Sequence, residues 1–228
     1  MGVLTIVERI FRERKGFFAE IKSNHQVGQK LAQMGIVATA CLVLYGLVLG
    51  ISHGIVQSLA SAVKLPLLYG LTLLLSLPAF YFFTLLAGSR LTFGQTLSLL
   101  LTGATVAAVL SLSLAPISAF FWISASDYLL FKLLNVGFMA LAGALGVVFL
   151  FQGSELVQGE VARRTRLALL WSWAVVFALV GTQLAWTLRP FFGSPLHSFQ
   201  WFRGVGGTFF GDLAHSLVAL LVSLLRPS

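Results

Sequence analysis

The side chains that could carry metal or cofactor chemistry are few and widely spaced. Histidine supplies three candidates, His53, His197 and His215, and Asp212 precedes the last of these by one helical turn. Such side chains bind metal ions or tetrapyrroles when several of them converge at short, regular spacing. The chain has no HxxxH or HExxH pattern, so we expect no metal site and no cofactor.

Nucleophilic catalysis would need an activated side chain, a base and an acid that orients the base. Ser194 lies three residues before His197, and Asp212 is the acid available to them. That spacing is common in loops and carries little specificity, so we predict no catalytic residues and a protein that is not an enzyme. Cys41 is the single cysteine, which excludes an intramolecular disulfide.

Two basic segments are candidates for binding anions. Arg189 opens the segment RPFFGSP, which ends at Pro195 and contains Ser194. An arginine at a helix end either satisfies the last carbonyl groups or binds an anionic partner. We therefore treat Arg189 and Ser194 as candidate contacts to a lipid phosphate or a partner's carboxylate. The second basic segment lies just before the apolar run that begins at residue 167. Its arginines are suited to bind lipid head groups, and they are Arg163, Arg164 and Arg166.

Long apolar runs must position these residues. The 228 residues are 58% hydrophobic and 10% charged, with a mean hydropathy of +0.94, which is too apolar for a water-soluble domain. Each run is long enough to cross a bilayer core of ~30 Å at ~1.5 Å per residue. The sequence predicts an all-α membrane protein with a five-span helical bundle over residues 33–188, with spans at about 33–52, 65–87, 96–121, 129–151 and 167–188.

Different segments flank the bundle. Residues 1–32 are basic, and helical periodicity places their apolar side chains on one face. This amphipathic helix lies either in the cytoplasmic head-group layer or with the same face on the protein's own spans. Residues 189–228 form an outer-face loop and a helix over 210–225, which we expect to be interfacial. A sixth span is the alternative, because sixteen residues are marginal for crossing a membrane.

Small residues and prolines mark special positions within the spans. Gly46, Gly50 and Gly54 recur every fourth residue, and Gly103 and Ala107 have the same spacing. Such lines of small residues let helices approach closely, either within the chain or against a partner helix or a second copy. Prolines inside a helix remove a backbone hydrogen bond. We therefore expect a kink in the second span and a bend or an end in the third, at Pro78 and Pro116.

The basic residues set the topology. With the amino terminus inside, ten of the fifteen Lys and Arg residues lie on the inner side, which the positive-inside rule favours. The outer side then holds the three candidate histidines. The basic residues behind the net charge of +8 lie beside the apolar runs, where they orient the chain in the membrane and contact anionic lipid head groups. We therefore expect no nucleic-acid partner. We predict an integral protein of a bacterial inner membrane, or of a thylakoid membrane, with a cytoplasmic amino terminus.

Two short segments of the sequence are similar to segments of known membrane proteins. The second span begins with KLP at 64–66, and the turn LAGSRLTFGQ at 86–95 joins spans two and three. Together with the basic lead and the five spans, these resemble the Yip1-like membrane proteins over roughly residues 60–188, which implies a five-span helical fold. The RPFFGSP segment and the tail resemble a group of bacterial membrane proteins of undefined role.

The spans contain packing seams and no charge in their apolar runs. Asn135 and Gln183 are the polar candidates within them for solute contact. We therefore predict a non-enzymatic accessory or scaffold protein that binds membrane lipids and either a membrane-protein partner or a second copy. The alternative is a channel or transporter for lipid or neutral solutes.

Overall fold

The computed structural model describes residues 3–125, 127–158, 161–192, 199–202 and 207–225, and it contains no strand within them. The elements follow in chain order: α1 (Val3–Arg12), α2 (Arg14–Lys22), α3 (Val27–Gly50), the 3₁₀ turn η1 (Ile51–His53), α4 (Ile55–Leu86), α5 (Phe93–Ala125), α6 (Tyr128–Val157), α7 (Arg163–Leu188) and α8 (Phe209–Leu225).

Five of these helices, α3 to α7, are long and apolar enough to cross a membrane. The prediction of an all-α, five-span bundle is therefore confirmed. The largest difference in bounds is at α4, which begins at Ile55 rather than near residue 65 and has Lys64 inside it. The charge of Lys64 does not end the helix, because its ammonium group donates to the carbonyl oxygens of Pro190 and Trp201.

Prolines lie inside two of the long helices. Pro78 is within α4, and Pro116 is within α5, which continues to Ala125. The prediction that Pro116 could end the third span is therefore wrong. One lost backbone bond does not stop a helix that neighbouring helices hold in place.

The main contacts between the spans run from α7 to α4, from α4 to α3, from α3 to α5 and from α5 to α6, so α3 packs against both α4 and α5. α6 and α7 contact each other much less, and one of their links is the edge-on packing of Phe151 and Trp171, with ring centroids 5.2 Å apart. α7 therefore depends mainly on α4 for its position. Only 11% of its most apolar stretch is buried, the smallest share among the five spans.

The amino-terminal helices pack on the chain's own spans. Their apolar side chains are buried in one cluster with residues of α3, α5 and α6: Ile6, Ile10, Phe17, Phe18 and Ile21. Phe18 packs directly on Gly153 of α6, where a Cβ on the glycine would lie 2.4 Å from the ring. Of the two placements that the sequence left open, the structure shows the second, so this face is not available to lipid. The helix is also split, with Glu13 between α1 and α2.

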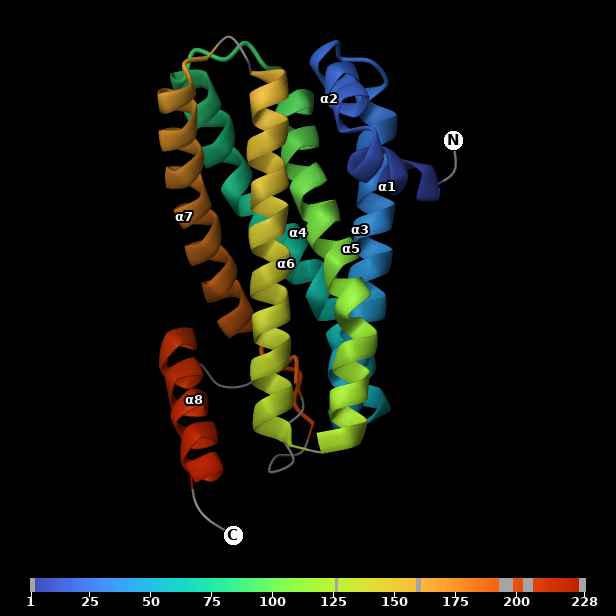
Figure 1. Cartoon of the computed structure of the whole chain (residues 1–228), viewed down its shortest axis with the longest axis vertical. Coiled ribbons are helices and arrows are strands. Elements are labelled where there is room, and N and C mark those ends of the chain that lie inside the picture. The colour runs from blue at the N-terminus through green and yellow to red at the C-terminus, as the bar shows by residue number, and fades with distance from the viewer. Residues whose placement is uncertain (1–2, 126, 159–160, 193–198, 203–206, 226–228) are drawn as a thin grey trace.

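α8 runs beside the first part of α6 and beyond the end of α7 (Figure 1). Lys132 of α6 holds it through an ion pair with Asp212 at 2.5 Å and a hydrogen bond to the Ser216 hydroxyl at 2.9 Å. The helix observed over Phe209–Leu225 agrees with the predicted range. Whether it lies in the membrane interface or crosses the membrane stays a prediction.

The bundle has two distinct ends, and the chain's termini lie toward opposite ones (Figure 1). We call the end that carries α1, α2, the α4–α5 turn and the α6–α7 connection the amino-terminal end. The other, with η1 and the segment after α7, is the carboxyl-terminal end. Ten of the fifteen Lys and Arg residues belong to segments of the amino-terminal end. Its placement in the cytoplasm stays a prediction.

Candidate functional site

The segment after α7 is fixed by one face of α4 at the carboxyl-terminal end. Gln57, Ser61 and Lys64 are spaced by four and three residues, so they share a helix face. The Gln57 amide donates to the carbonyl oxygens of Pro190 and Phe191 at 3.1 and 3.3 Å, and the Ser61 hydroxyl donates to that of Phe191 at 2.6 Å. All three side chains are buried, so these bonds satisfy polar groups that water does not reach.

Lys64 completes this contact. Its ammonium group donates to the carbonyl oxygen of Pro190 at 3.2 Å and to that of Trp201, and it lies 5.1 Å from the centre of the Phe202 ring. A cation beside the carbonyl groups that follow a helix end is favourable. The sequence indicates Arg189 as one possible donor to the last carbonyl groups of α7. Lys64 of the neighbouring helix donates to carbonyl oxygens that lie beyond the end of α7.

Arg189, a predicted anion contact, lies over the Trp186 ring, with its guanidinium carbon 3.3 Å from the ring centre. The two side chains therefore make a cation–π contact. The peptide bond from Arg189 to Pro190 is cis. Ser194 and His197 lie outside the described residues, so the structure does not place the predicted Ser194 contact or the Ser194 and His197 pair.

The candidate metal ligands that the structure describes are His53, Asp212 and His215. Asp212 pairs with Lys132 rather than with His215, and His53 ends the η1 turn. Within the part of the chain that the structure describes, no group of three or more histidine, cysteine or acidic side chains comes together.

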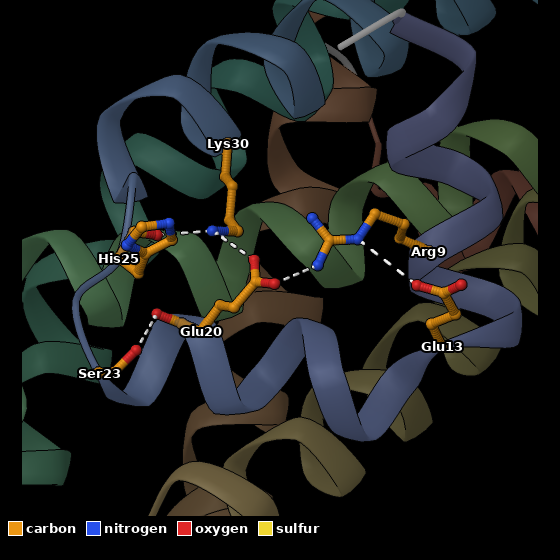
Figure 2. Close-up of polar contacts among 6 residues, drawn as sticks. All are labelled: Arg9, Glu13, Glu20, Ser23, His25 and Lys30. Atoms are coloured by element: carbon orange, nitrogen blue, oxygen red, sulfur yellow. Dashed lines mark hydrogen bonds and ion pairs between the residues drawn. The ribbon is translucent and has the colours of Figure 1, made fainter.

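An ion cluster joins α1, α2 and α3 at the amino-terminal end (Figure 2). Glu20 accepts hydrogen bonds from Arg9 at 2.5 Å and pairs with Lys30 at 2.9 Å, while Lys30 also donates to the carbonyl oxygen of His25 at 2.6 Å. Arg9 also lies 3.7 Å from Glu13. The Arg9 hydrogen bond, followed by that of Lys30, lowers the pKa of Glu20 to about 2. This cluster fixes the two short helices onto the bundle.

The three arginines at the start of α7 have different surroundings. Arg163 and Arg164 are exposed, whereas Arg166 is only 5% exposed. The Arg166 guanidinium lies 3.4 Å from the carbonyl oxygens of Gln158 and Val161 and 3.5 Å from the carboxylate of Glu155. The sequence grouped these residues as one basic surface, and the helix turns one of them into the protein.

A cavity lies beside Arg166, between the last turns of α4 and the first turns of α7. Its volume is about 10 Å³, and Thr84, Gln158 and Arg166 supply its polar lining, with Phe83 and Leu169 among the apolar side chains. The Nε atom of Arg166 and the Nε2 atom of Gln158 have no hydrogen-bond partner among the described residues. We call this the α4–α7 cavity.

Polar side chains inside the bundle bond to one another. Asn135 of α6 accepts hydrogen bonds from the hydroxyls of Tyr45 and Ser118 at 2.9 and 2.6 Å, and it donates to the carbonyl oxygen of Phe131 at 2.8 Å. This network ties α3, α5 and α6 together, as polar groups do between membrane helices. Asn135 is thus engaged in holding helices, while Gln183 is exposed on α7.

Both predicted lines of small residues are packed within the chain. A Cβ on Gly46 or Gly50 would lie 2.6 Å or less from backbone atoms of α4, and one on Gly103 would lie 2.9 Å from the carbonyl oxygen of Gly146. Ala107 lies at the same contact with α6, since a Cβ on Gly146 would be 3.1 Å from its methyl group. Gly54 is not part of a seam, because α3 ends at Gly50 and Gly54 turns the chain with a φ of +113°.

Comparison with known proteins gives no family for the chain. No family model, no curated protein and no solved structure matches it.

Proposed function

We propose that this chain is a non-enzymatic accessory or scaffold protein of the membrane that binds a transmembrane helix of a partner protein on the outward face of α6. One observation carries the proposal: Gly137, Ala140 and Ala144 are all exposed on that face. Nothing lies within 4 Å of the position that a Cβ on Gly137 would take. A helix can approach closely along such a line of small residues.

The packed seams of the same chain support this interpretation. Gly46 and Gly50 bring α3 against the backbone of α4, and Gly103 and Gly146 do the same for α5 and α6. Each seam is a line of small residues covered by another helix. The outward line on α6 has the same chemistry and is not covered by a described helix of the chain.

The charge at the amino-terminal end favours a different protein over a second copy. Ten Lys and Arg residues and five acids belong to segments of that end. Two copies side by side with the same orientation would bring these basic ends together, and like charges repel. A partner whose loops at this level carry acidic residues would instead be attracted.

The interior supports binding at the surface rather than a path through the bundle. Asn135 is one of the buried polar side chains between α3, α5 and α6, and it already makes three hydrogen bonds to the chain. Breaking these bonds inside a membrane protein would be costly.

Site-specific photocrosslinking in native membranes tests the proposal. A photoreactive benzophenone amino acid at Ala140 or Ala144 should form a discrete adduct with one partner protein, identified by mass spectrometry. The matched control is Leu75 of α4, which is 57% exposed and should give no such adduct. The Ala144→Leu substitution, which adds apolar bulk to an exposed face, should lower partner recovery without lowering the thermal stability of the isolated chain. Adducts with lipid alone, or with a second copy, would overturn the proposal.

A further inference from the structure

The α4–α7 cavity carries an inference that does not depend on the proposed partner. We propose that it binds the phosphate of an anionic phospholipid, with one phosphate oxygen accepting hydrogen bonds from Arg166 and Gln158. Its lining comes from the last turns of α4, the first turns of α7 and Gln158 at the end of α6.

Two buried donors define the chemistry. Arg166 and Gln158 are 5% and 4% exposed, and the Nε atom of the first and the Nε2 atom of the second have no partner among the described residues. Both side chains line the cavity. Buried N–H groups require an acceptor, and a charged acceptor forms the stronger bond with a guanidinium.

The positive charge of Arg166 is only weakly compensated in its surroundings. Its nearest described carboxylate, that of Glu155, lies 3.5 Å away and belongs to a side chain that is 63% exposed. Arg163 and Arg164 are exposed on the same first turn of α7. The N-cap residue Ala162 makes no side-chain hydrogen bond to this turn. The backbone N–H groups and the helix dipole therefore add to the attraction for an anion.

The size and walls of the cavity favour a lipid over a free ion. Its volume of about 10 Å³ accommodates one oxygen-sized atom. The rest of a bound phosphate must therefore lie at the cavity's mouth. Arg163 and Arg164 are exposed on the same turn of α7 as Arg166, which lines the cavity. Phe83 of α4 and Leu169 of α7 line the same cavity. Because both helices are apolar enough to span the membrane, acyl chains can extend along them from that mouth.

Native mass spectrometry of the delipidated full chain tests this site. Phosphatidylglycerol should bind in preference to phosphatidylcholine, and millimolar inorganic phosphate should not displace it. Gln158→Glu places a carboxylate beside Arg166, so it supplies the missing acceptor while repelling phosphate. We expect this variant to keep its thermal stability and to bind phosphatidylglycerol about tenfold more weakly or worse.

A matched control is Arg12→Gln, since Arg12 has a side chain that is 78% exposed and carries the same charge at the same end of the bundle. It should bind phosphatidylglycerol as the unsubstituted chain does. Arg166→Gln should weaken binding at least as much as Gln158→Glu. Unchanged binding in a folded Gln158→Glu protein would overturn the proposal. Displacement of the lipid by inorganic phosphate would overturn the assignment to lipid.

Discussion

The contact between α3 and α4 allows a quantitative test, because two glycines of one helix have opposite surroundings. A Cβ on Gly46 would lie 2.6 Å from the carbonyl oxygen of Ser61 and 2.7 Å from the Cα atom of Ala62. At Gly35, also inside α3, nothing lies within 4 Å of the added atom. Gly46→Ala therefore tests the packing, and Gly35→Ala controls for everything else that the same substitution changes.

The expected size follows from these distances. Ordinary contacts of a Cβ atom begin at 3.4 Å, so α3 and α4 would have to separate by about 0.8 Å to accept alanine at Gly46. Overpacking of this kind costs about 1–3 kcal/mol. Alanine also gains up to about 1 kcal/mol of helix propensity over glycine. That gain applies at both positions, so the difference between the two variants isolates the packing cost.

We expect Gly35→Ala to match or slightly exceed the unsubstituted chain in free energy of unfolding. Gly46→Ala should lie below Gly35→Ala by about 1–3 kcal/mol. Titration of the detergent-solubilised chain with sodium dodecyl sulfate, followed by circular dichroism, measures both. Gly50→Ala should lose at least as much as Gly46→Ala, because its Cβ would lie 2.4 Å from the Cα atom of Ser58. Equal stability of Gly46→Ala and Gly35→Ala would refute the inference that backbone contact sets the distance between these helices.

Two further predictions concern the ends of the bundle. The pKa of Glu20 in the folded chain is about 2, below its ordinary value of 4.5. Its ion pairs therefore stabilise α1 and α2 fully above pH 4.5 and are lost as the pH falls from 4.5 toward 2. The protection of α2 amides against hydrogen exchange, relative to their intrinsic rates at each pH, should fall over that range, and Glu20→Gln should remove this dependence. At the other end, Lys64→Met removes a donor from the carbonyl oxygens of Pro190 and Trp201. Chymotrypsin should then cleave after Phe191, which is buried, faster than in the unsubstituted chain or in the control Lys132→Met. An unchanged cleavage rate would contradict the role given to Lys64.

Hydropathy and length were sufficient to predict the five spans. A run of twenty or more apolar residues has few stable alternatives to a membrane helix, and the five long helices lie where the runs are. The lines of small residues could be predicted as well, except for Gly54, since their spacing is a property of one helix. The sequence left open which helix covers each line, because that depends on how different helices pack.

The contacts of Lys64 could not be predicted in the same way. Its acceptors lie 126 and 137 residues further along the chain, and a charge next to an apolar run ordinarily marks the end of a span. The sequence therefore placed Lys64 in a loop. A lysine three residues after Ser61 and seven after Gln57 is a helical pattern that could have indicated a buried polar face, given a start of the helix before residue 57.

The burial of Arg166, next to the exposed Arg163 and Arg164, could not be predicted for a similar reason. Successive residues of a helix differ in direction by about 100°, so one arginine among three can face inward. Which one does so depends on the rotation of α7 against α4, and that rotation is set by side chains remote in sequence. Trp173 shows this, since its ring packs edge-on against Phe80 at 4.9 Å and its Nε1 atom donates to the carbonyl oxygen of Ser76 at 3.1 Å.

These contacts make α4 the helix that positions α7 along its whole length. Near the amino-terminal end, α4 lines the cavity beside Arg166. In the middle it binds Trp173, and at the carboxyl-terminal end Gln57, Ser61 and Lys64 hold the segment after α7. α6 contributes little to this support. The outward face of α6 is therefore not needed to hold α7 in place. A helix face must be free in this way to bind a partner.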